Sequence, residues 1–174
     1  MDRHIILGKL NTLVIDRITE PGIYLMCEDD ESVLLPNAYI TNDMHVGNEI
    51  EVFVYTDSED RLISTTLKPY GMLNDIVAVD VVDLLPFGAF VDIGLPKDLL
   101  VPKNKQKASF RVGERRVIKI VEDENSGRLI GTEKFALQDA DKNLNRNDEV
   151  EIVIYAKTPL GYKVVVNSLY EGMI

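Results

Sequence analysis

The chain has 174 residues, of which 45% are hydrophobic and 28% charged, and its net charge is −10. A chain of this length holds one domain or two to three small ones, and it lacks the run of about 18 apolar residues that a membrane-spanning helix needs. Its N-terminal apolar stretch is too short for a signal peptide, and its single cysteine, Cys27, excludes an intramolecular disulfide. We therefore expect a cytoplasmic protein, since thiols stay reduced in that compartment.

Five short strands are predicted in the first 66 residues. They cover 10–20, 23–27, 32–35, 49–55 and 61–65. Over 49–55 aliphatic residues alternate with polar or aromatic ones, a period of two that is typical of a half-buried strand. Pro21-Gly22 and the acidic residues 28–31 mark turns. An irregular connection over 37–45, with room for one helical turn, separates the third strand from the fourth.

The same order of strands returns between residues 74 and 132. The expected strands are 74–83, 88–93, 99–101, 114–121 and 128–132. The repeated landmarks are Gly22-Ile-Tyr-Leu25 with Gly88-Ala-Phe-Val91 and Leu34-Leu-Pro36 with Leu100-Val-Pro102, each 66 residues apart, and Arg61-Leu-Ile63 with Arg128-Leu-Ile130, 67 apart. This period is that of a domain duplication rather than of a solenoid, whose units run about 20–50 residues. Two copies of one module favour a binding protein over an enzyme with a single active site.

The last segment resembles the beginning of a third copy. Strands are expected over 149–156, 161–167 and 171–174, and Gly161-Tyr-Lys-Val164 occupies the place of Gly88-Ala-Phe-Val91. A barrel of this kind needs about five strands to close. We therefore expect an incomplete third domain in an N-terminal fragment of a longer protein. The alternative is a naturally short protein whose C-terminal hairpin packs onto the second barrel.

Five strands in about 60–70 residues, with a longer third-to-fourth connection, are the layout of a small Greek-key barrel of the oligonucleotide-binding type, the OB-fold. The predicted fold class is all-β, with tandem five-stranded OB-fold barrels plus a partial third repeat. The predicted domains are 1–66, 73–134 and the incomplete 148–174. Pro69 and Gly71 punctuate the short linker between the first two.

Charge is distributed unevenly between the repeats. Residues 1–66 contain 13 acidic and 4 basic residues, whereas residues 67–137 contain 10 acidic and 11 basic ones. Eight bases lie within 97–119, namely Lys97, Lys103, Lys105, Lys107, Arg111, Arg115, Arg116 and Lys119. Such a run either forms a positive patch or lies in solvated loops. In either case the two repeats cannot have equal affinity for a polyanion.

Several motifs of the second repeat resemble the RNA-binding domain first described in the ribosomal small-subunit protein S-one. They are Phe87-Gly-Ala-Phe-Val91, Val112-Gly-Glu114 and the turn from Asp123 to Gly127-Arg-Leu129. Over the whole chain, the residues are similar to the bacterial conserved virulence factor B family, for example in Lys97-Asp-Leu-Leu-Val-Pro102 and Leu160-Gly-Tyr-Lys-Val-Val165. The resemblance implies tandem RNA-binding domains of this type, followed in that family by a winged-helix domain.

Candidate nucleic-acid contacts are aromatic faces and basic side chains. Phe90 alternates with aliphatic residues and should face outward, and a glycine bulge at Gly88 would bring Phe87 to the same face. The alternative is that one or both rings belong to the core. The resemblance implies that these two rings stack on bases, with Asp123 and Arg128 beside them. Lys103 and Lys105, from the basic run, complete the candidate site of the second repeat.

The first repeat keeps less of this site. Tyr24 replaces Phe90, Pro21 stands at the position of Phe87, and Arg61 corresponds to Arg128. The family's usual histidine after the third strand is replaced by proline in both repeats. With a net charge of −9 around them, Tyr24 and Arg61 would hold RNA weakly at best.

No arrangement of residues indicates an enzyme, a metal site or a cofactor. His4 and His45 are isolated, Cys27 has no evident base, and no phosphate-binding glycine loop is present. Two functions remain. The first is an RNA-binding regulatory protein that grips single-stranded RNA mainly through the second barrel and influences gene expression. The second is an acidic module that contacts a basic ribosomal or transcription partner. Self-association through the incomplete third domain is a further expectation.

Overall fold

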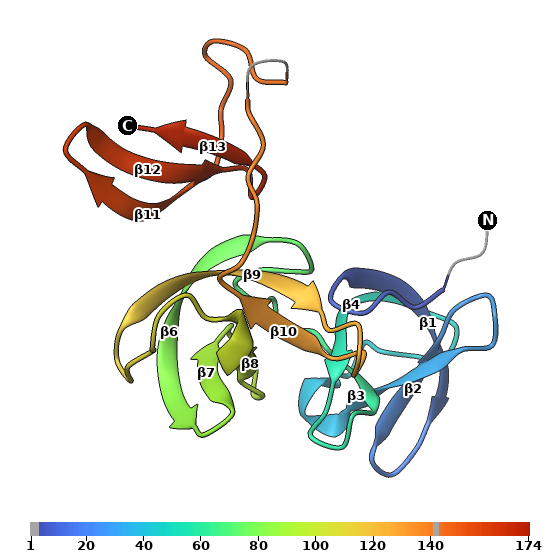
Figure 1. Ribbon diagram of the computed structural model, residues 1–174. Coiled ribbons are helices and arrows are strands. Elements are labelled where there is room, and N and C mark those ends of the chain that lie inside the picture. Colours follow the sequence, from blue (N-terminus) through green and yellow to red (C-terminus); the bar gives the residue numbers. More distant parts are fainter. Residues whose placement is uncertain (1–3, 141–142) are drawn as a thin grey trace. The chain divides into compact units, whose positions relative to one another are not determined.

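The computed structural model describes residues 4–140 and 143–174, and it consists of β-strands joined by turns and two short 3-10 helices (Figure 1). In this part of the chain there is no α-helix, and thus no helix long and apolar enough to cross a membrane. The strands form two five-stranded sheets and one three-stranded sheet. The predicted fold class is confirmed.

The first sheet is a closed barrel in the order β1-β2-β3-β5-β4. Its elements are β1 (Leu10–Ile18), β2 (Gly22–Met26), β3 (Ser32–Pro36), the 3-10 helix η1 (Asn37–Tyr39), β4 (Glu49–Thr56) and β5 (Leu62–Thr65). Because successive side chains of a strand point to opposite faces, every second residue enters the core. The core residues are Leu13, Ile15, Ile23, Leu25, Val33, Leu35, Val52 and Val54. Burying an aliphatic side chain of this size contributes about 1.5–3 kcal/mol.

The first barrel closes where β3 meets β5. Leu34 and Ile63 form a parallel pair, and the buried hydroxyl of Ser64 donates a 2.9 Å hydrogen bond to the Leu34 carbonyl oxygen. The outer face of β4 is covered as well. Phe53 and Tyr55 are 1% and 9% exposed and their rings stack 6.2 Å apart. These two rings are therefore not free to meet a separate partner.

The second sheet has the order β10-β9-β6-β7-β8. Its elements are β6 (Ile76–Leu85), β7 (Gly88–Asp92), β8 (Leu99–Pro102), the 3-10 helix η2 (Lys103–Lys105), β9 (Arg115–Glu122) and β10 (Leu129–Thr132). Gly131 of β10 takes the place that Ser64 has in β5. A Cβ at Gly131 would lie 2.8 Å from Cγ2 of Val101 in β8, so the two outer strands of the sheet approach each other. We call this nearly closed sheet the second barrel.

Contacts divide the chain into two compact units. The first unit comprises the residues up to Leu73 together with 94–97 and 122–129, and the second comprises 74–93, 98–121 and 130–174. Within the first unit, Lys97 Nζ donates hydrogen bonds to the carbonyl oxygens of Thr56, at 3.0 Å, and Asp57, at 2.7 Å. Burial lowers the pKa of this amine.

The third sheet consists of β11 (Ile152–Thr158), β12 (Gly161–Val166) and β13 (Tyr170–Met173). Its backbone repeats the geometry of β1-β2-β3 and β6-β7-β8. The first strand of each set has a register shift, between Ile15 and Arg17, Val81 and Asp83, and Ile154 and Ala156 respectively. The second strand of each set begins at a glycine that closely approaches a backbone carbonyl. An added Cβ would lie 2.1 Å from Leu35 O at Gly22, 2.7 Å from Val101 O at Gly88 and 2.4 Å from Ile174 O at Gly161.

Side chains at core-facing positions are less buried in the three-stranded sheet than in the two barrels. Ile152 and Ile154 are 45% and 50% exposed, whereas their counterparts Leu13 and Ile15 are buried. Within the second unit, Gln138 bridges to β13, accepting a hydrogen bond from the Glu171 amide and donating one to the Leu169 carbonyl, both 2.9 Å long.

Strand ends differ from the predicted ones by up to three residues. The first strand was expected to reach residue 20 but ends at Ile18, because the amide and hydroxyl of Thr19 both bond to the Gly22 carbonyl and form a tight turn. The sixth begins at Ile76 rather than at Asn74, whose φ of 72° is left-handed and does not fit an extended strand.

Candidate nucleic-acid interface

Two phenylalanine rings meet at the end of the β6–β7 hairpin. Phe87 lies in the turn and is 58% exposed, and Phe90, on β7, is half-buried. Their ring centroids are 6.5 Å apart and their planes are inclined at 88°, an edge-to-face arrangement. The core residues Ala89 and Val91 flank Phe90 and are fully buried. The two rings thus form an aromatic corner outside the barrel core.

Gly88 does not act here in the way the sequence suggested. The bulge lies in the facing strand β6, between Val81 and Asp83, and Asp83 is the residue opposite Phe90. The glycine is required for a different reason, since a Cβ there would collide with the Val101 carbonyl oxygen. Close approach of β7 to β8, together with a bulge in β6, therefore places the two rings on one face.

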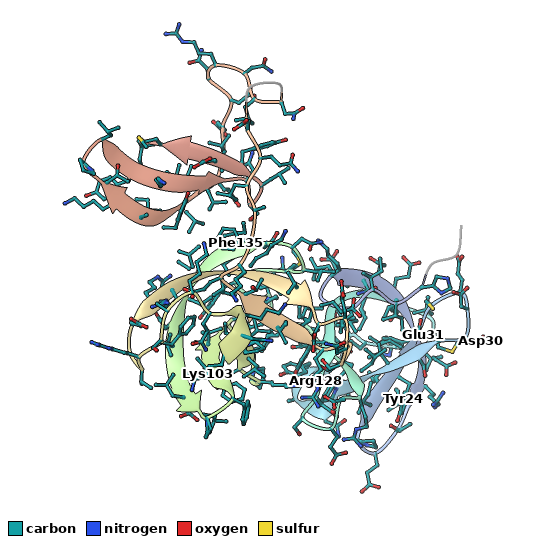
Figure 2. All side chains as sticks on the ribbon, viewed as in Figure 1. Tyr24, Asp30, Glu31, Lys103, Arg128 and Phe135 are labelled. Atoms are coloured by element: carbon teal, nitrogen blue, oxygen red, sulfur yellow. The ribbon has the colours of Figure 1, made fainter. Side chains whose placement is uncertain are left out.

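One candidate lysine is held next to this corner. The backbone amide of Lys103 donates a 3.0 Å hydrogen bond to the Phe87 carbonyl oxygen, and the Lys103 residue is exposed. Lys105 lies two residues further along η2 and is half-buried, and its carbonyl accepts a 2.9 Å bond from the Glu133 amide. Figure 2 shows Lys103 on the second barrel.

Carboxylates also gather near Phe90. The pKa of Asp98 is raised, first by burial and then by the charges of Asp92 and Asp83. The sequence did not indicate that Asp83, Asp92 and Asp98 lie near one another, because this depends on strand register. This face of the second barrel is consequently less positive than the local count of bases implies.

Ion pairs neutralise part of the charge of the eight bases in the basic run. Arg115 pairs with Asp80 at 3.0 Å. Arg116 pairs with Glu133 at 2.8 Å and lies 4.3 Å from the centroid of the Phe110 ring. Lys97 is engaged within the first unit, as described above. Among the described residues, the bases of this run that form no ion pair are Lys97, whose amine is bonded to backbone carbonyls instead, and Lys103, Lys105, Lys107, Arg111 and Lys119.

Asp123 and Arg128 belong to the first compact unit, whereas the aromatic corner belongs to the second. They close their turn through a 2.8 Å hydrogen bond from the Asp123 amide to the Arg128 carbonyl. The Asp123 carboxylate accepts a 2.7 Å bond from the Ser126 hydroxyl, and the Arg128 guanidinium pairs with Asp60. The charge of Arg128 is thus partly neutralised.

The corresponding groups of the first barrel are occupied by its own side chains. The Arg17 guanidinium lies 4.2 Å from the centroid of the Tyr24 ring, across from it on β1. Figure 2 shows Tyr24 on the first barrel. Arg61 pairs with Asp57 at 2.9 Å and with Glu59 at 3.0 Å. Such cation–π and ion-pair contacts must be given up before the ring or the guanidinium can meet RNA.

Burial tends to raise the pKa of Asp57. Hydrogen bonds from the amides of Arg61 and Glu59 and from the Arg61 side chain outweigh this effect and lower the pKa. The carboxylate is therefore held in its charged form beside Arg61. In the described part of the chain, no three histidine, cysteine, aspartate or glutamate side chains come together to hold a metal ion.

Two family models match the chain in succession. Residues 7–67 match a model described as S1 domain, and residues 71–155 match one described as S1 RNA binding domain. A Bacillus subtilis (strain 168) protein named uncharacterized protein YitL is 39% identical over 95 residues, which are 54% of this chain and 32% of that protein.

A solved structure resembles nearly the whole chain. It is the crystal structure of a multidomain protein with nucleic acid binding domains from Streptococcus pneumoniae TIGR4, with a TM-score of 0.64 and 20% sequence identity. The match covers 94% of this chain and 60% of that one. At this identity the likeness concerns the fold, and the chain spans only part of both relatives. The finer resemblance to the conserved virulence factor B family stays a prediction.

Proposed function

We propose, from the premise that this chain contains two tandem S1 domains, that it is a cytoplasmic RNA-binding regulatory protein that influences gene expression. Single-stranded RNA is held mainly by the second barrel, and the first barrel contributes little. The observation that carries the proposal is the aromatic corner of the exposed Phe87 and the half-buried Phe90, with Lys103 bonded through its amide to Phe87.

The corner offers what an unpaired base requires. Stacking of a base on an aromatic face contributes about 1–3 kcal/mol and tolerates any base. Because the two rings are nearly perpendicular, a base stacked on one ring meets the edge of the other. Lys103 and Lys105 supply positive charge for the adjoining phosphates. Asp83 and Asp98 repel phosphates but accept hydrogen bonds from base amino groups, so bases rather than phosphates should approach this face.

The proposal is tested with Phe90→Ala and Phe87→Ala, using Tyr24→Ala as the matched aromatic control in the first barrel. Fluorescence anisotropy with labelled polypyrimidine and mixed-sequence RNA should show a loss of about 1–3 kcal/mol in binding free energy for Phe90→Ala. Phe87→Ala should lose a comparable amount, and Tyr24→Ala much less because Arg17 already occupies that ring.

Thermal melts distinguish a missing stacking partner from an unfolded barrel. The Phe90 variant should melt close to the parent protein, because its ring lies outside the core. If Phe90→Ala keeps both its melting temperature and its RNA affinity, or if the parent protein has no affinity for RNA at low salt, the proposed site is wrong.

A further inference from the structure

A second surface of the first barrel has the properties of a binding groove. An open groove of about 800 Å³ lies on the outer face of this barrel. Its apolar lining includes Ile6, Val14 and Met26, and its carboxylates are Glu28 and Glu49. Ile6 is 54% and Val14 39% exposed, so both present apolar surface to the groove. The candidate RNA-binding residues of the first barrel, Tyr24 and Arg61, do not line this groove.

Strand register places the acidic and apolar groups in one row. Val14 of β1 is paired on one side with Met26 of β2 and on the other with Glu49 of β4. Neighbouring strands are about 4.8 Å apart, so a carboxylate stands one strand away from an apolar floor. Glu51 faces Thr12 in the adjoining row and adds a further exposed carboxylate.

The N-terminal segment and the β2–β3 turn form the wall of the groove. The Ile5 amide donates a 3.2 Å hydrogen bond to Glu31, and His4 contacts the Asp29 carboxylate. The Ile6 amide donates a 2.8 Å bond to the Asn11 side chain. Figure 2 shows Asp30 and Glu31 at this turn. Because these bonds fix the wall in place, the groove is a preformed feature of the barrel.

Charge identifies the chemistry of the occupant. The repeat that contains the groove has 13 acidic and 4 basic residues, and two of the acids line the groove itself, so a nucleic-acid backbone is repelled. A lysine or arginine side chain matches both the apolar lining and the carboxylates of the groove. Its aliphatic stem can lie on Val14 and Met26 while its charge reaches Glu28 or Glu49.

We propose that this groove binds a basic segment of a protein partner in which lysine or arginine residues alternate with apolar residues. The first barrel then serves protein contact while the second holds RNA. Peptide binding in the groove does not depend on the RNA site, because the groove lies on the first barrel and the RNA site on the second.

Binding is tested with a fluorescently labelled 12-residue peptide that alternates lysine and leucine, and with a peptide of equal charge in which serine replaces leucine. The parent protein should bind the lysine–leucine peptide about tenfold more tightly, because only this peptide covers the apolar floor. Glu28→Gln combined with Glu49→Gln should weaken this binding about tenfold, or about threefold for each exposed ion pair. Equal binding of the two peptides would overturn the proposal.

The matched control is Glu20→Gln with Glu124→Gln, which removes the same charge at exposed positions outside the groove. It should change peptide affinity by about twofold or less, through long-range charge alone. If this control weakens binding as much as the groove variant does, net charge and not the groove attracts the peptide. The Phe90→Ala variant should keep full peptide affinity, and its loss would place the peptide elsewhere.

Discussion

In the first barrel the ring of Tyr24 lies beneath the guanidinium of Arg17, whereas the ring at the equivalent position of the second barrel, Phe90, lies edge-to-face with Phe87. The residue opposite the ring explains the contrast. It is Arg17 in the first barrel and Asp83 in the second. A cation covers an aromatic face and an aspartate does not, so the cation–π contact of Tyr24 has no counterpart between Phe90 and the residue opposite it.

The turns that join the fourth and fifth strands of each barrel also share their backbone but differ in their side-chain contacts. Each is closed by a 2.8 Å hydrogen bond between its aspartate amide and its arginine carbonyl, from Asp57 to Arg61 and from Asp123 to Arg128. The left-handed residue is Asp60 in one turn and Gly127 in the other, so the single-residue insertion falls before it. The turn geometry survives the insertion, but the side chains that pair with the arginine change.

These differences teach that the duplication conserves the framework and leaves the outward positions free to diverge. Glycines at strand starts, bulges in the first strands and inward aliphatic residues are shared. Substitutions in the shared framework should therefore have larger effects than substitutions of the divergent groups.

The largest effect is expected at the shared glycines. Gly22→Ala and Gly88→Ala each force a Cβ against a backbone carbonyl of the third strand, which should cost about 3 kcal/mol or more of unfolding free energy. Chemical denaturation measures the loss of stability, and amide hydrogen exchange shows in which of the two barrels it occurs. Gly113→Ala is the control, since that glycine has a φ of 87° but no neighbour within 4 Å. A Gly88 variant no less stable than this control would show that close approach does not require the glycine.

The next effect concerns barrel closure. Ser64→Ala removes the buried hydroxyl that bonds to the Leu34 carbonyl and should cost the first barrel about 1 kcal/mol. The second barrel, with Gly131 at this place, has no such bond to lose. Ser58→Ala, at an exposed position, should leave the denaturation midpoint unchanged. If the two serine variants behave alike, the buried hydroxyl does not stabilise the closure.

A smaller and pH-dependent effect is expected for Asp57→Asn. The pKa of Asp57 is lowered in the folded state, so its contribution to stability is present above the unfolded value of about 3.9 and is lost as the pH falls through the folded pKa. At neutral pH the variant should be less stable by about 0.5 kcal/mol. The two stability curves should converge below about pH 4, and a constant difference at all pH values would contradict this cause.

The smallest effect is the electrostatic share of RNA binding. Lys103→Gln with Lys105→Gln should reduce the slope of log affinity against log salt by about 0.7 for each phosphate that the protein no longer neutralises. Arg61→Gln should leave the slope unchanged, because Asp57 and Glu59 already neutralise that guanidinium. Arg128→Gln should change it less than either lysine, since Arg128 pairs with Asp60. A slope that responds equally to all these changes would remove the distinction between the barrels.

The sequence by itself determined the strand order, the duplication and the three strands that follow the second copy. These features depend on local signals, namely a period of two in hydrophobicity and turn residues at fixed spacing, which act within a few residues of the chain. It also indicated that Phe87 and Phe90 could share a face, although the bulge responsible lies in β6 and not at Gly88.

Only the tertiary structure decided which charged and aromatic groups are available. Counting bases left open whether the basic run forms a positive patch, but Arg116 is paired with Glu133 and Arg128 with Asp60, a residue 68 positions away. Phe53 and Tyr55 alternate with the core residues Val52 and Val54 and are nevertheless buried. Ion pairing and exposure depend on which distant residues the fold brings within a few ångströms, and no local pattern encodes that distance.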